Sequence, residues 1–115
     1  MMGFFQRRGR AVETAAGCPL TEDARRLRLR FVGQVQGVGF RWTSMGVARD
    51  LGLTGWVKNE LDGSVTAEIQ GSAAHVGAFF SQMLEAYRRY PISYTVDERE
   101  DIPLVEGETD FEVRY

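Results

Sequence analysis

Residues 26–41 read RLRLRFVGQVQGVGFR, and three structural signals follow one another in this stretch. Polar and apolar residues alternate over 26–32, as they do in a strand that buries one face. A glycine-rich turn, Gly33–Arg41, comes next. Behind it, apolar residues recur every three positions, which predicts a short amphipathic helix with this set in the core: Trp42, Met45, Ala48 and Leu51. A turn that enters a helix N-terminus points backbone N–H groups outward and binds anions, phosphate above all.

The next part of the chain predicts a hairpin and a longer helix. Two short strands, 54–59 and 65–69, flank Asp62-Gly63, a pair typical of tight hairpins. Ser72 is a suitable N-cap for the helix that follows. Apolar residues recur in this helix at helical spacing: Val76, Phe79, Phe80, Met83, Leu84 and Tyr87.

Pro91 is expected to end the segment that contains this helix. Polar and apolar residues alternate again after it. Residues 92–96 predict a fourth strand, and residues 111–115 predict a possible extra edge strand. The order β-α-β-β-α-β is the split βαβ arrangement of ferredoxin-like folds. We therefore expect an α+β domain in which an antiparallel sheet carries two helices on one face.

The composition is that of one globular domain without a membrane or nucleic-acid signal. The chain has 115 residues and 43% hydrophobic content, and no apolar run approaches the ~20 residues that cross a bilayer. Acidic residues outnumber basic ones after residue 30, whereas nucleic-acid surfaces are usually basic. The expected third strand also lacks the exposed aromatics on which RNA bases stack. We expect neither a membrane nor a nucleic acid as partner.

Residues 1–24 differ from the rest of the chain. They show no strand or helix period and no apolar segment of the kind that a signal peptide needs. We expect a disordered or loosely attached extension there, followed by a domain at residues 25–115. The lone cysteine, Cys18, cannot form an internal disulfide, which favours a reducing compartment and hence the cytoplasm.

The glycine-rich turn differs from the nucleotide-binding loops. A Walker A loop needs Gly-Lys-Ser/Thr, and Gly39-Phe40-Arg41 stands here instead. A dinucleotide fingerprint needs a third glycine where this chain has Trp42. The pattern is better suited to a lone phosphoryl group, held by backbone N–H groups of residues 36–40 and by the guanidinium of Arg41.

Two segments together resemble the signature segments of the acylphosphatase family. They are Gly33–Arg41, which reads GQVQGVGFR, and Gly55–Val65, which reads GWVKNELDGSV. The resemblance extends over residues 25–115 and includes the βαββαβ order. It implies hydrolysis of the carboxyl-phosphate bond of acyl phosphates, to a carboxylate and inorganic phosphate, with no metal and no cofactor.

The resemblance also implies the site residues. The family's catalytic arginine corresponds to Arg41 and its catalytic asparagine to Asn59. The phosphate-binding loop corresponds to a run of seven residues: Gln34, Val35, Gln36, Gly37, Val38, Gly39 and Phe40. The chemistry agrees with these roles, because Arg41 stays protonated and can clamp phosphate oxygens. Asn59 has the acceptor and the donors that orient a water molecule.

The implied partner is a small acyl phosphate, and we expect the protein to be a monomer. No residue identifies the acyl part, because acetyl phosphate, carbamoyl phosphate and 1,3-bisphosphoglycerate share the same transferable group. An alternative remains open: a non-catalytic module on the same fold that binds phosphate or carbamoyl phosphate.

Overall fold

The computed structural model describes residues 22–89 and 93–115. The elements follow the predicted order, with the extra strand at the end: β1 Ala24–Gly33, α1 Phe40–Asp50, β2 Thr54–Asn59, β3 Val65–Ser72, α2 Ala73–Ala86, β4 Tyr94–Ile102 and β5 Phe111–Arg114. The predicted break at Pro91, the strand start at Ile92 and most of the expected extension lie outside the described residues. None of the described helices is long and apolar enough to cross a membrane.

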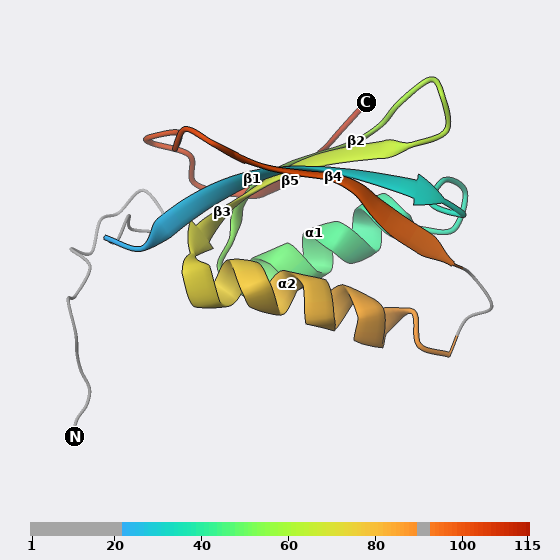
Figure 1. The fold of residues 1–115 in the computed structure, drawn as a ribbon, viewed down its shortest axis with the longest axis horizontal. Coiled ribbons are helices and arrows are strands. Elements are labelled where there is room, and N and C mark those ends of the chain that lie inside the picture. The colour runs from blue at the N-terminus through green and yellow to red at the C-terminus, as the bar shows by residue number, and fades with distance from the viewer. Residues whose placement is uncertain (1–21, 90–92) are drawn as a thin grey trace.

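The five strands form one sheet in the order β4-β1-β3-β2-β5, and both helices lie on one face of it (Figure 1). β1 pairs antiparallel with β3 and β4, and β2 pairs antiparallel with β3. The predicted α+β fold is therefore confirmed. β5 pairs parallel with β2, so the sheet is mixed rather than wholly antiparallel. The reason is that residues 103–110 carry the chain from the β4 edge to the opposite edge.

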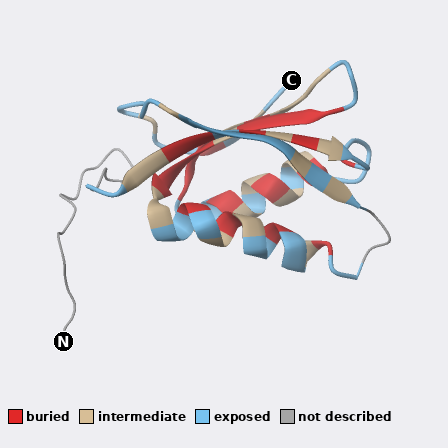
Figure 2. Ribbon diagram, in the orientation of Figure 1, coloured by how far each residue is buried: buried red, intermediate tan, exposed pale blue. Residues whose placement is uncertain are grey.

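The core lies between the sheet and the two helices (Figure 2). Alternate residues of β1 enter it, and Leu27, Leu29 and Phe31 are at most 1% exposed. Near the end of β1, four aromatic rings contact one another with centroids 5.0 to 6.3 Å apart: Phe31, Phe40, Tyr87 and Tyr94. This aromatic cluster joins the start of α1 to the end of α2 and to the sheet.

Helix α1 begins at Phe40 and buries much of the predicted face, because Ala48 is fully buried and Met45 and Leu51 pack, partly buried, against the core. Its buried residues are Phe40, Ser44 and Ala48, spaced four apart. Phe40 belongs to the aromatic cluster, and its position there sets the rotation of the helix. The prediction that Trp42 lies in the core was wrong, because the residue is 54% exposed.

Candidate active site

The loop between β1 and α1 presents a row of backbone donors. Gly37 and Gly39 adopt φ values of 79° and 76°, which L side chains rarely reach, and Gly39 is the N-cap of α1. Within the described residues, none of the N–H groups of residues 36–40 donates to another protein atom. These groups lie at the positive end of the α1 dipole, an arrangement that can accept an anion.

Hydrogen bonds to two neighbouring segments hold this loop in place. The Gln34 N–H donates to the Ser93 carbonyl at 3.0 Å, and Gln34 Oε1 accepts from the Ser93 N–H at 3.0 Å. Gln36 Nε2 donates to the carbonyls of Glu60 and Ser64, at 2.8 and 2.9 Å. Because Glu60 and Ser64 belong to the β2–β3 hairpin, the loop and the end of β2 are held together as one unit.

A further contact comes from the end of α2. The Tyr87 hydroxyl donates to the Val38 carbonyl at 3.3 Å and lies 3.2 Å from Thr43 Oγ1. Its ring also stacks on Phe40, so one side chain joins the loop to the first turn of α1. The sequence predicts Tyr87 as an apolar helix position only. Ser93 was not predicted to hold the loop. Neither Tyr87 nor Ser93 lies in a recognisable motif.

A cavity of about 200 Å³ lies beside the loop. Residues from the loop, the first turn of α1 and the end of β2 line it: Val35, Gly37, Gly39, Phe40, Arg41, Trp42 and Asn59. The two predicted catalytic residues, Arg41 and Asn59, thus meet at one cavity, although β3 lies between β1 and β2. The predicted loop residues Gln34, Gln36 and Val38 do not line it; the side chains of the two glutamines anchor the loop instead.

Asn59 ends β2 and has an unsatisfied side-chain amide at the cavity wall. Its Oδ1 is buried and has no hydrogen-bond partner, and within the described residues the side chain makes no hydrogen bond at all. A buried acceptor without a donor costs about 1–3 kcal/mol. A donor that enters the cavity, such as a water molecule, would recover that free energy.

Arg41, in the first turn of α1, has a charge that no carboxylate of the described residues neutralises. Its Nη1 donates to the Arg114 carbonyl at 3.3 Å, and its Cζ lies 4.8 Å from the centroid of the Tyr115 ring. No described carboxylate lies within ion-pair distance of it. Since a guanidinium has five N–H donors, most of them remain available to an anion. The cavity therefore combines one fixed positive charge with a neutral amide.

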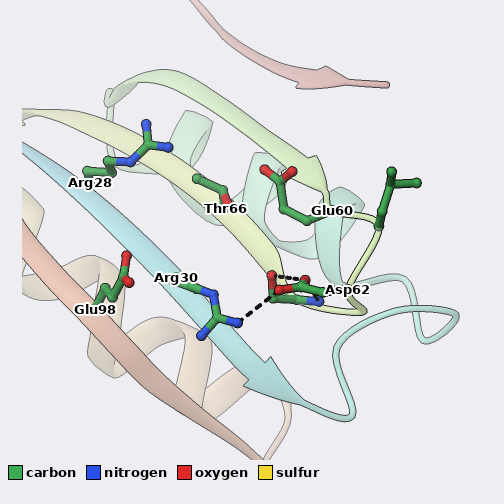
Figure 3. A pocket seen from close by; sticks show the side chains of 8 residues that line it. Arg28, Arg30, Glu60, Asp62, Thr66 and Glu98 are labelled. Atoms are coloured by element: carbon green, nitrogen blue, oxygen red, sulfur yellow. Dashed lines mark hydrogen bonds and ion pairs between the residues drawn. The ribbon is translucent and has the colours of Figure 1, made fainter.

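A second hollow, of about 430 Å³, lies on the sheet face that the helices leave open, and its cations are already paired. It is lined by two arginines together with polar and acidic residues: Arg28, Arg30, Glu60, Leu61, Asp62, Ser64, Thr66 and Glu98. Figure 3 shows Arg30 directed toward Asp62, 3.0 Å away, and Arg28 pairs with Glu68 at 2.9 Å. Two hydrogen bonds from Ser64, together with Arg30, lower the pKa of Asp62 to about 2. This hollow therefore attracts an anion less than the cavity at Arg41 does.

The chain is similar to several acylphosphatases. A family model described as Acylphosphatase matches residues 27–113. A curated acylphosphatase of Mesorhizobium japonicum is 40% identical over 96 residues, which cover 82% of this chain and 98% of the relative. One of Rhizobium etli is 47% identical over 70 residues, or 61% of this chain and 70% of the relative. The solved structure of an acylphosphatase from Coxiella burnetii has 31% identity and a TM-score of 0.67, over 81% of this chain and 95% of that one.

Proposed function

Because the chain belongs to the acylphosphatase family, we propose that its β1–α1 loop and Arg41 hold the phosphoryl group while Asn59 orients the attacking water. The activity itself is acyl-phosphate hydrolysis, which yields a carboxylate and inorganic phosphate. Our proposal assigns this reaction to particular atoms of the cavity. It keeps the seven loop residues of the sequence prediction, with Gln34 and Gln36 acting through the position of the backbone.

The transition state of phosphoryl transfer spreads negative charge over the peripheral phosphate oxygens, so positioning and electrostatic stabilisation carry the catalysis. The free N–H groups of residues 36–40 and the guanidinium of Arg41 would donate to those oxygens. Arg41 cannot act as a base, because its pKa keeps it protonated. Its planar set of donors is suited to two oxygens at once.

The observation that carries the proposal is the unsatisfied Oδ1 of Asn59 at the wall of the same cavity. A water that donates to this oxygen would have a lone pair directed at a phosphorus held on the loop. The water oxygen bonds to phosphorus, the bond from phosphorus to the acyl oxygen breaks, and its electron pair leaves on the carboxylate. One proton of the water passes to a phosphoryl oxygen, so the products are a carboxylate and dihydrogen phosphate. Because a carboxylate is a good leaving group, the step needs no strong general base.

We further propose that the reaction proceeds without a metal ion, in the cytoplasm, and that the protein is a monomer. Metal independence follows from the division of roles above, since Arg41 and the backbone donors supply the positive potential that a metal would otherwise provide. The cytoplasmic assignment rests on the single cysteine of the chain.

Hydrolysis of benzoyl phosphate in the presence of EDTA tests the proposal. The wild-type protein should release benzoate and phosphate at a rate that EDTA does not change. Arg41→Gln should lower kcat/KM by at least ~10²-fold. Arg88→Gln, at an exposed arginine beyond α2, should leave it unchanged. If the wild type showed no turnover, the result would support a phosphate-binding module instead. If EDTA abolished turnover, the proposal of metal independence would be wrong.

A further inference from the structure

The cavity leaves the acyl group outside the phosphate site, an inference that rests on the function proposed above. Its volume of about 200 Å³ equals that of about seven waters in the liquid. A phosphoryl group, the attacking water and an acetyl group together occupy most of that space. An acyl group larger than acetyl therefore extends past the cavity rim, where it meets the side chains exposed there.

Trp42 is the large apolar side chain at that rim. It lines the cavity and yet is 54% exposed, whereas the other apolar lining residues, Val35 and Phe40, are only 1% exposed. It directly follows Arg41 in the first turn of α1, and both side chains line the same cavity. Val38, in the loop, is 38% exposed and adds apolar surface next to Gly37 and Gly39.

The rim is also poor in charge. Among the residues that line the cavity, Arg41 is the charged one, and the mechanism already uses it for the phosphoryl group. An acyl group that carried a second phosphate or a carboxylate would find no partner for that charge in the lining. A flat apolar acyl group would instead stack on the indole and remove apolar surface from water.

We propose that Trp42 is the residue that binds the acyl group, and that the enzyme prefers acyl phosphates with flat, apolar acyl groups over acetyl phosphate. The stacking contact is the same before and in the transition state, because the acyl group lies away from the phosphorus. Such uniform binding lowers KM and leaves kcat unchanged. Trp42 thus acts differently from Asn59, which is expected to act on kcat.

Steady-state kinetics with benzoyl phosphate and acetyl phosphate test this role. In the wild type, benzoyl phosphate should have the lower KM. Trp42→Ala should raise the KM for benzoyl phosphate about tenfold, with kcat for both substrates and the KM for acetyl phosphate within about twofold of wild type. Trp42→Phe, which keeps a stacking ring, should retain most of the preference. Leu84→Ala, at another exposed apolar residue, is the matched control and should change nothing.

The two proposals fail in different ways. If the wild type hydrolyses both substrates and Trp42→Ala leaves the ratio of their KM values unchanged, the acyl role of Trp42 is wrong and the phosphate site stands. If the wild type hydrolyses neither substrate, the proposed function of the site is wrong, and the proposed acyl-binding role of Trp42 is wrong as well. Inhibition by inorganic phosphate checks the fold of each variant, because the inhibition constant should be the same in Trp42→Ala and wild type.

Discussion

Asn59 keeps a buried carbonyl oxygen without a donor, at a cost to stability of about 1–3 kcal/mol. If its purpose is to orient water, Asn59→Ala should lower kcat on benzoyl phosphate by at least ~10²-fold. The inhibition constant of inorganic phosphate should stay within about twofold, because phosphate is held by other groups. The free energy of unfolding should not fall, since no hydrogen bond is lost and the unsatisfied acceptor is removed. A parallel loss of phosphate affinity would make Asn59 a phosphate-binding residue instead.

Glycine is favoured at position 39 by its backbone conformation and not by a lack of room for a side chain. A Cβ built on it meets no atom within 4 Å, but its φ of 76° is unfavourable for an L residue and costs about 1–2 kcal/mol. Gly39→Ala should therefore turn the N–H groups of the loop and weaken inhibition by inorganic phosphate about tenfold. The control is Gly46→Ala, in α1, where the space is equally open and φ is not positive. That change should raise stability by about 0.5–1 kcal/mol and leave phosphate inhibition unaltered. Equal phosphate inhibition in both variants would contradict a conformational role for Gly39.

At the residue scale, the sequence indicates which residues meet at the cavity but not how they are held there. Arg41 and Asn59 were predicted from two motifs, and both line the cavity; their catalytic roles stay predictions. The bond from Tyr87 to the Val38 carbonyl could not be predicted, because an aromatic at helical spacing normally indicates burial. Trp42 was wrongly assigned to the core, because a three-residue period does not define which face of a short helix is buried.

At the element scale, one carboxylate joins the turn of the β2–β3 hairpin to β1. Asp62 accepts from the Ser64 N–H at 2.9 Å and from the Ser64 hydroxyl at 2.6 Å, and it pairs with Arg30 at 3.0 Å. These contacts lower its pKa from 3.8 to about 2. A carboxyl group whose pKa is lower in the folded state stabilises the fold above its unfolded pKa. That stabilisation is lost as the pH falls toward the folded value.

Asp62→Asn should therefore lower the Tm at pH 5–7 by a constant amount, and the difference from wild type should shrink as the pH falls from about 4 to about 2. Thermal unfolding followed by circular dichroism over this pH range measures it. Asp50→Asn is the control, because Asp50 is exposed and has no hydrogen-bond partner among the described residues. A difference between Asp62→Asn and wild type that persists undiminished at pH 2 would show that the charge of Asp62 does not stabilise the hairpin.

The sequence predicts the elements with local signals and misses those determined by distant contacts. Ser72 was predicted as an N-cap, and its hydroxyl accepts from the His75 N–H. The parallel pairing of β5 had no local signal. It follows the connection at 103–110, which Arg26 holds against the sheet through Glu108, 82 residues away in sequence. Burial lowers the pKa of Arg26, but bonds to Glu108 and Glu68 outweigh it and raise the pKa above its usual range.

At the scale of the whole molecule, the sheet has two edge strands, and both carry features that oppose pairing with another chain. β4 is rich in exposed charged residues: Asp97, Glu98, Arg99, Glu100 and Asp101. β5, at the other edge, has only four residues. Short or charged edge strands prevent the addition of a further strand, and two copies of β4 would bring carboxylates opposite one another. These edges support the proposed monomer.

The charge of the β4 edge can be removed without breaking an ion pair. Glu98 and Glu100 make none within the described residues, so Glu98→Gln/Glu100→Gln should fold normally and keep the wild-type kcat. Sedimentation velocity should show the wild type as one species near 13.0 kDa at all concentrations. The double variant should sediment faster as its concentration rises, because the repulsion between edges is weaker. Asp50→Asn/Glu106→Gln loses the same charge at exposed residues outside β4, where neither carboxylate has an ion pair within the described residues, and should stay monomeric. If this control also associated, net charge rather than the edge strand would maintain the monomer, and a dimeric wild type would contradict the role of the edges altogether.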